Sequence, residues 1–221
     1  MSRWATFDCY GTLIDWNAGI AGTLERLFGA ERTPELLARY HQIEPEIQAE
    51  TFRTYAEVLS LSLERLVSET GLAMPEGESG TLVHSLPDWP HFREVPAALT
   101  ELRRRGWNLA ILSNTDHALI VESAKRLGVP FDLIVTAEDV RSYKPAHAHW
   151  ERFFETAAVD KEHHVHVAAS LFHDVAPARE LGLRIVWINR LGEQADPEPD
   201  RELPDLAGLP DALDELVPAP A

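Results

Sequence analysis

The sequence contains very little cysteine, since Cys9 is the single one among 221 residues. One cysteine excludes an intrachain disulfide and is typical of a protein in a reducing compartment, so we expect a cytoplasmic location. Long apolar runs are also missing, because no stretch approaches the roughly 20 residues of a transmembrane helix. The first motif reaches Asp8 so soon after Met1 that we expect no signal peptide.

Positive charge is scarce as well. Lysine and arginine total 20 against 36 aspartates and glutamates, and the formal net charge is −16 at pH 7. Such a chain cannot neutralise a phosphate backbone or an anionic membrane, so we expect neither nucleic acid nor membrane as a partner. A small anionic substrate would need a local basic pocket. The composition leaves a homodimer open.

A short apolar run near the N-terminus ends abruptly at Asp8, and Gly11 then breaks the pattern. A buried strand followed by a glycine turn places this carboxylate at the carboxyl edge of a sheet, where open α/β folds build their sites. Asp8 is therefore either the chemical centre or an aspartate that closes a turn. Cys9 points to the other side of an extended chain, and we expect it to be a small buried hydrophobe.

The region after Asp15 has the periodicity of helices and no convincing strand pattern. Four helices fit before residue 86, with Thr33 capping one of them and Pro34 in its first turn. The proline-spaced residues 87–96 are typical of a return linker. We therefore expect an inserted helical cap with its linker at 16–92, and a core made of residues 1–15 and 93–221.

From residue 97 onward, strand and helix patterns alternate. Helices are expected at 97–105, 118–127, 148–158 and 175–181, and strands at 107–112, 131–136, 165–169 and 184–189. The tail from residue 196 reads as a surface segment with one short helix near Leu209–Leu216. This order predicts an α/β fold, with a Rossmann-like parallel sheet core, helices on both faces and the inserted helical bundle cap.

Four segments carry a family resemblance. They are Phe7-Asp8-Cys9-Tyr10-Gly11-Thr12-Leu13, Leu112-Ser113-Asn114-Thr115, Tyr143-Lys144-Pro145 and Ser170-Leu171-Phe172-His173-Asp174. Their order and spacing resemble the haloacid dehalogenase superfamily, and within it the L-2-haloacid dehalogenase branch, over essentially the whole chain. The helical insertion is similar to the cap of that branch.

The resemblance implies hydrolytic dehalogenation of a short 2-haloacid without a cofactor. Asp8 would attack the carbon that bears the halogen, and Asp174 would orient and deprotonate the water that hydrolyses the resulting ester. An aspartate suits the first task because its pKa of about 3.9 leaves it ionised at neutral pH without a base. Lys144 would hold the nucleophile and offset its charge, and Thr12 can donate a hydrogen bond to it from the turn. Taken alone, Lys144 would be a solvated surface lysine.

The remaining candidates concern the substrate. Ser113, Asn114 and the amides of the following helix form an anion-binding corner suitable for a carboxylate, unless they are an ordinary helix cap. Arg39 falls where the family's cap supplies an arginine to the halide, although an exposed helix arginine explains it equally well. Trp150 stands where the branch usually has a tyrosine. We assign Arg39, Trp150 and Tyr10 to substrate binding.

Tyr10 separates two activities. Phosphatases of the superfamily place a second aspartate there to protonate the departing alkoxide, whereas a halide leaves without a proton. The alternative function is a magnesium-dependent phosphatase acting on a small phosphate ester, in which Asp8, Asp174 and a backbone carbonyl would bind the metal. A non-catalytic binding protein is a third interpretation.

The sequence also departs from the branch near its last motif. Where the branch carries Ser-x-Asn ahead of the final aspartate, this chain has Ala169 and Leu171, which cannot supply those polar contacts. His173 is either a polar partner of Asp174 or, more simply, a surface or packing histidine. His164 and His166 fall on one face of a strand, but no third ligand of clear spacing supports zinc.

Overall fold

The computed structural model describes residues 2–219 and contains one parallel sheet in the order β3-β2-β1-β4-β5-β6. All neighbouring strands in it run parallel. The strands are β1 (Arg3–Phe7), β2 (Trp107–Ser113), β3 (Leu133–Thr136), β4 (His164–Ala168), β5 (Ile185–Ile188) and β6 (Arg201–Leu203). The predicted α/β class is confirmed, and β1, which leads to Asp8, lies in the middle of the sheet.

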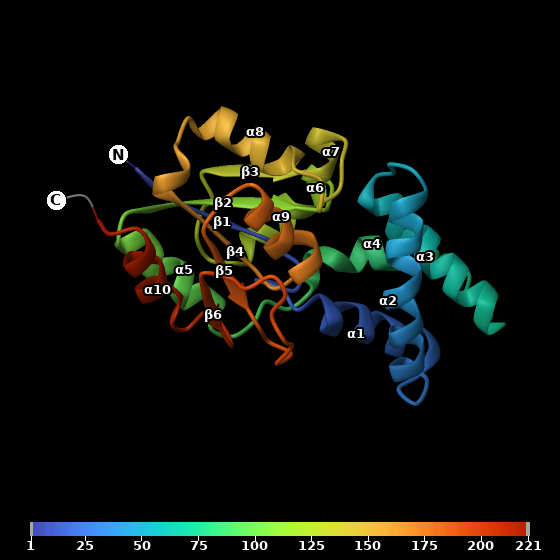
Figure 1. The fold of residues 1–221 in the computed structure, drawn as a ribbon. Coiled ribbons are helices and arrows are strands. Elements are labelled where there is room, and N and C mark those ends of the chain that lie inside the picture. The colour runs from blue at the N-terminus through green and yellow to red at the C-terminus, as the bar shows by residue number, and fades with distance from the viewer. Residues whose placement is uncertain (1, 220–221) are drawn as a thin grey trace.

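Helices cover both faces of the sheet because the buried strands present apolar side chains on each side. Ala5 and Phe7 of β1 belong to one buried cluster, and Ala110 and Leu112 of β2 belong to a second. Figure 1 shows α8 on one side of the sheet and α5 and α10 on the other. The helices of this core are α5 (Val95–Arg104), α6 (His117–Lys125), α7 (Ala137–Val140), α8 (Ala148–Ala157), α9 (Ala176–Glu180) and α10 (Leu209–Leu216).

The segment between β1 and β2 begins with four helices in the described chain, as its periodicity predicted. We call these the cap helices: α1 (Trp16–Phe28), α2 (Thr33–Glu50), α3 (Tyr55–Thr70) and α4 (Thr81–Ser85). They lie beside the carboxyl ends of the strands (Figure 1). A 3₁₀ turn, η1 (Leu86–Asp88), leads back to the core. The division into a core of 1–15 with 93–221 and a cap of 16–92 stays a proposal.

A carboxylate of the core holds one end of the cap helices. The Asp116 side chain accepts hydrogen bonds from the backbone amides of Tyr55 and Ala56, at 2.7 and 2.8 Å, in the first turn of α3. The Tyr143 hydroxyl donates to the Arg53 carbonyl at 3.0 Å. Because the first amides of a helix have no partner within it, Asp116 stabilises α3 while fixing its position against the core.

Some local predictions were wrong. Thr33 is the first residue of α2 rather than its cap, and its hydroxyl donates to the Gly29 carbonyl at 3.1 Å. The helix expected at 175–181 is preceded by a π-helical turn, η3 (Leu171–Val175), and a short turn, η2 (Lys161–His163), leads into β4. The tail also supplies β6, which was not predicted. No helix within residues 2–219 is long and apolar enough to cross a membrane.

Candidate active site

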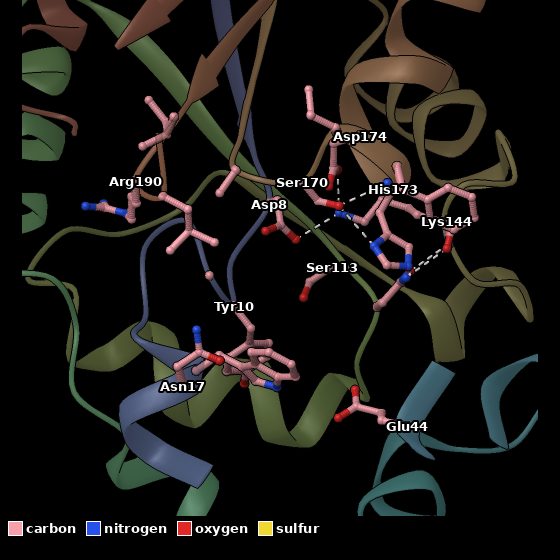
Figure 2. Close-up of a pocket in the computed structure, with 18 of the residues that line it drawn as sticks. Asp8, Tyr10, Asn17, Glu44, Ser113, Lys144, Ser170, His173, Asp174 and Arg190 are labelled. Atoms are coloured by element: carbon pink, nitrogen blue, oxygen red, sulfur yellow. Dashed lines mark hydrogen bonds and ion pairs between the residues drawn. The ribbon is translucent and has the colours of Figure 1, made fainter. Parts of the chain in front are cut away.

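One lysine links two carboxylates at the carboxyl edge of the sheet. The Lys144 ammonium donates to Asp8 Oδ1 at 2.9 Å and to Asp174 Oδ1 at 2.7 Å. Its third hydrogen bond goes to the Leu112 carbonyl at 2.9 Å. Figure 2 shows this group at the wall of a cavity. Because all three protons of the ammonium are used, its position relative to both carboxylates is fixed.

The second oxygen of Asp8 has its own donor. The Thr12 hydroxyl donates to Asp8 Oδ2 at 2.8 Å and itself accepts from the Ala169 amide at 2.9 Å. The turn after β1 makes this possible, since Gly11 takes a φ of +97° that brings Thr12 back toward the strand end. Asp8 is thus held at both oxygens.

Burial and charge act in opposite directions on this cluster. Burial disfavours the charged form of Lys144, but Asp174 and Asp8 outweigh it and raise the pKa of the lysine. Burial likewise acts to raise the pKa of Asp174, but Lys144 and His166 lower that pKa well below its usual range. Lys144 and Asp174 are therefore an ion pair at neutral pH.

A buried chain of hydrogen bonds supports Asp174 from the neighbouring strands. The His166 ring contacts Asp174 Oδ1 through Nε2 at 3.0 Å and Thr6 Oγ1 through Nδ1 at 2.8 Å. Thr6 also contacts His164 Nε2 at 2.8 Å. Because ionised Asp174 can only accept, His166 donates to it from Nε2. The Thr6 hydroxyl links the rings of His166 and His164.

The part played by His166 was not predicted from the sequence. Asp174 was expected to lack polar partners because Ala169 and Leu171 replace the Ser-x-Asn of the dehalogenase branch. The partner comes instead from inside β4, where His166 pairs in register with Thr6 of β1. The two-residue spacing of His164 and His166 was the available signal, since it places both rings on one face of a strand.

Asn114 positions the lysine segment. Its side-chain oxygen accepts from the Lys144 amide at 2.7 Å, and its side-chain nitrogen donates to the Lys144 carbonyl at 3.0 Å. Ser113 lies at the end of β2, is 1% exposed and lines the cavity. Both predicted residues are therefore at the site, but the side-chain amide of Asn114 is occupied by the backbone of Lys144.

The π-helical turn η3 carries the last motif. Ser170 caps it, since its hydroxyl accepts from the His173 amide at 3.1 Å and lies 3.1 Å from His173 Nδ1. This turn directs His173 and Asp174 to the same cavity wall. His173 is thus a cavity residue and not a surface histidine, and burial lowers its pKa. Cys9, in contrast, is fully buried, as predicted.

The cavity has a volume of about 750 Å³ and lies between the sheet edge and the cap helices. The core contributes Asp8, Ser113, Lys144 and Asp174, and α2 and α3 contribute Glu44 and Tyr55. Its further lining residues are Tyr10, Gly11, Asp15, Trp16, Asn17, Pro45, Gln48, Phe92, Asn114, Ala169, Ser170, Leu171, Phe172, His173, Ile188, Arg190, Leu191 and Glu193. All four motif segments therefore contribute residues to one cavity.

Tyr10 is in the cavity wall, with its hydroxyl engaged elsewhere. That hydroxyl lies 3.0 Å from Ser123 Oγ on α6, and the ring stacks on Tyr55 at 6.3 Å between centroids. Burial raises the pKa of Tyr10 well above its ordinary value. Tyr10 thus presents a neutral aromatic face to the cavity.

Two predicted site residues are not brought to the cavity. Arg39 lies on the outer side of α2, where its guanidinium binds Glu69 at 2.7 and 2.9 Å. Trp150 is fully buried beneath the sheet and packs edge-on against His166 at 5.3 Å. The prediction that they bind substrate is therefore wrong as regards direct contact. The position of Arg39 in the sequence does not reveal which face of α2 turns inward. Trp150 packs against His166 and is not part of the cavity wall.

The donor set was compared with the needs of magnesium. This ion prefers oxygen ligands in an octahedral arrangement. Lys144 takes Oδ1 of both carboxylates, and Thr12 already binds Asp8 Oδ2. Within residues 2–219 no three His, Cys, Asp or Glu side chains gather as ligands. In this arrangement Asp8 and Asp174 bind the Lys144 ammonium.

Comparisons with known proteins agree with this geometry. Residues 3–182 match the haloacid dehalogenase-like hydrolase family. The (S)-2-haloacid dehalogenase of Pseudomonas sp. (strain YL) is 29% identical over 211 residues, covering 92% of this chain and 90% of the relative. Haloacetate dehalogenase H-2 of Moraxella sp. (strain B) is 28% identical over 96% of each chain.

Solved structures support the same fold. L-2-haloacid dehalogenase RSc1362 superposes with a TM-score of 0.87 at 23% identity, over 96% of this chain and 99% of that one. The enzyme of Xanthobacter autotrophicus with chloropropionic acid covalently bound gives 0.83 at 19% identity, over 96% and 98%. The chain belongs to the haloacid dehalogenase-like hydrolase family.

Proposed function

We propose that this protein hydrolyses the carbon–halogen bond of 2-haloacids, with Asp8 as the nucleophile. The observation that carries the proposal is the Asp8–Lys144–Asp174 group, which opens on a cavity between sheet and cap helices. The names of the two curated relatives, a 2-haloacid and a haloacetate dehalogenase, point to the same reaction.

In the first step an Asp8 oxygen attacks C2 of the substrate. The new C–O bond forms as the carbon–halogen bond breaks, and the halide leaves with the bonding electron pair. Lys144 and Thr12 hold the carboxylate in one orientation for this attack. Asp8 is 8% exposed, so little water shields its charge once substrate fills the cavity.

In the second step water attacks the carbonyl carbon of the aspartyl ester. Asp174 Oδ2 is buried and has no hydrogen-bond partner, while its Oδ1 is held by Lys144 and His166. This oxygen is therefore the one we assign to accept the proton of the attacking water. As the acyl C–O bond breaks, Asp174 returns this proton to the departing alkoxide, which leaves as the 2-hydroxyacid. The second proton of the water passes to solvent, and Asp8 returns to its carboxylate.

The substrate carboxylate is assigned to the end of β2. Ser113 lines the cavity there, and the hydroxyl of a serine and the amides that follow a strand are donors suited to an anion. Tyr10 supports a halide as the leaving group, since its hydroxyl is held by Ser123 and cannot act as the acid that an alkoxide needs. A short haloacid needs no cofactor in this scheme.

One turnover in oxygen-18 water tests the mechanism. With protein in excess over 2-chloropropionate, the ester route puts the label into Asp8 and leaves the product hydroxyl unlabelled. Trypsin releases Asp8 in the peptide Trp4–Arg26, which also contains Asp15, so fragmentation must place the label. Freshly purified Asp8→Asn is the control and should release no chloride. Label in the product alone would overturn the proposal.

Measuring which anion is released separates a dehalogenase from a phosphatase. Phosphoserine phosphatase of Thermus thermophilus is 33% identical over 122 residues, which is 53% of this chain and 49% of that one. Chloride release in the presence of a chelator supports the dehalogenase. Phosphate release from small phosphate esters that requires added magnesium, without chloride release, would replace it. If neither chloride nor phosphate is released, a binding protein is favoured.

A further inference from the structure

Glu44 is a second buried acid in the cavity, on the side of the cap helices. It lies on α2 and is 6% exposed. Figure 2 shows its carboxyl group facing the space that Asp8, Ser113 and Tyr10 border from the core. The mechanism above does not use this group, so its presence in an apolar wall calls for another explanation.

Only one oxygen of this carboxyl group has partners. Oε1 accepts from the Tyr55 hydroxyl and from Gln48 Nε2, each at 3.2 Å. Oε2 is buried and has no hydrogen-bond partner. A buried carboxyl oxygen without a donor is destabilising unless a ligand supplies one.

The basic residues of the cavity wall do not offset Glu44. Lys144 is taken up by Asp8 and Asp174, and Arg190 binds Glu94 at 2.7 Å. Arg39, the cap arginine expected here, pairs with Glu69 on the outer surface. An anionic group near Glu44 would therefore be repelled, whereas a cation would be attracted.

The size of the cavity leaves room for such a group. Its 750 Å³ falls within the range of about 300–1,000 Å³ that accommodates drug-sized ligands. A haloacetate or chloropropionate would occupy a small part of it. The wall near Glu44 includes the rings of Tyr55 and Tyr10, and aromatic faces attract ammonium groups.

We propose that Glu44 binds a positively charged nitrogen at the far end of a substrate whose reacting carbon lies against Asp8. The inference rests on the proposed function: a 2-halo acid with a terminal ammonium would place its carboxylate at Ser113 and its nitrogen at Glu44. Such a zwitterion is also less repelled than an anion by a chain of net charge −16.

The titratable groups around Glu44 are tyrosines. They are Tyr40 on α2, Tyr55 on α3 and Tyr143 before Lys144, and the pKa of each is raised above its ordinary value of 10. Burial raises the pKa of Glu44 to about 7, although the Tyr40 and Tyr55 hydroxyls act against this rise. Glu44 therefore changes charge between pH 6 and 8.5, whereas the lowered pKa values of His41 on α2 and of His173 in the cavity wall keep those rings neutral over most of this range.

The test uses matched pairs of 2-chloro acids in which a terminal ammonium replaces a methyl group. One such pair is 6-amino-2-chlorohexanoate with 2-chloroheptanoate, and shorter pairs vary the reach. At pH 8.5 we expect kcat/KM to favour the amine of the best pair by at least about tenfold, as for a charge-assisted hydrogen bond. At pH 6 this preference should shrink, because Glu44 takes up a proton while the amine stays charged.

Glu44→Gln should reduce the amine preference at pH 8.5 by about tenfold. Glu35→Gln, an exposed change in the first turn of the same helix, is the control and should leave it unchanged. Glutamine nearly matches glutamate in shape, and urea unfolding of both variants checks that the fold is intact.

A binding measurement separates this inference from the proposed function. Calorimetry compares 6-amino-2-hydroxyhexanoate with 2-hydroxyheptanoate, which need no reaction to bind. Tighter binding of the amine that Glu44→Gln abolishes supports the inference even if no chloride is released from any substrate. Chloride release with equal kcat/KM in every pair, or equal binding of both hydroxy acids, would overturn the inference and leave the dehalogenase proposal standing.

Discussion

At the scale of single residues, His166 illustrates how a polar network replaces one lost from the sequence. Its ring connects Asp174 to Thr6 and, through Thr6, to His164. All three supporting residues are fully buried. The network therefore fixes which Asp174 oxygen is left without a hydrogen-bond partner.

His166→Phe should slow hydrolysis of the Asp8 ester more than its formation. The substitution keeps an aromatic ring next to Trp150 but removes the donor to Asp174, so we expect a ten- to hundredfold fall in kcat, on the order of what misplaced catalytic groups cost. The readout is ester on the Asp8 peptide after rapid quenching, detected by mass spectrometry. A merely destabilised protein would lose activity without accumulating ester. His84→Gln, an exposed change on α4, is the control.

The chemistry at the sheet edge was largely predictable from local motifs. Asp8, Thr12, Ser113, Lys144 and Asp174 each follow a strand or sit in a short motif, so their meeting follows from the parallel sheet alone. Glu44 lies inside a helix, and nothing local distinguishes it from a surface residue, whereas the spacing of His164 and His166 showed a shared strand face but not the contact with Asp174. The position of Arg39 was not predicted because a helix offers several faces, and the buried residues Leu36, Tyr40 and Ile43 decide which face of α2 turns inward.

At the scale of elements, two glycines of α1 have opposite surroundings. A Cβ on Gly19 would meet Trp89 Cγ at 2.2 Å, whereas one on Gly22 would meet nothing within 4 Å. Trp89 is 3% exposed and lies where the chain returns from the cap helices to the core. Close contact between α1 and this return segment therefore requires a glycine.

Gly19→Ala should lower the free energy of unfolding by about 1–3 kcal/mol, the usual effect of overpacking. Gly22→Ala, the matched control, should raise it by up to about 1 kcal/mol because alanine favours the helix. Urea unfolding followed by tryptophan fluorescence measures both changes. Equal effects of the two variants would show that α1 and Trp89 do not pack as described.

Segments with regular apolar spacing were predicted better than segments without it. The helix at Leu209–Leu216 was expected at the residues where α10 lies, because its apolar spacing is regular. The strand β6 has three residues in an acidic, proline-rich stretch and pairs only with β5, so its formation depends on an existing sheet. The helix start at Thr33 failed because a threonine before proline can cap a helix or begin one.

At the scale of the whole molecule, buried ionisable groups couple stability to pH. Burial lowers the pKa of His149 to about 3 and that of His164 well below its ordinary 6.5. Below pH 6.5 the unfolded chain binds a proton at each of these residues and the folded protein does not, so stability falls as pH falls. Glu44 has the opposite effect on stability. Between pH 7 and about 4.3 the folded protein binds a proton at Glu44 and the unfolded chain does not, so this group alone raises stability as pH falls.

The histidines with lowered pKa, His149, His164, His41 and His173, outnumber Glu44, so the free energy of unfolding should fall as the pH falls from 6 to 4.5. Each extra proton bound by the unfolded chain contributes about 1.4 kcal/mol per pH unit. Urea unfolding at pH 7.5, 6.0 and 4.5 measures this slope. Glu44→Gln removes the opposing group and should steepen it. A free energy of unfolding that stays level or rises over this range would contradict the assignment of neutral buried histidines.

The residues assigned to bond formation and cleavage all lie at the edge of the sheet. Glu44, the acid assigned to substrate recognition, lies on the cap helix α2. Reactivity and selectivity are consequently encoded in different stretches of the gene. A chimera that joins the cap helices of one relative to the sheet of another should therefore act on different substrates by the same reaction.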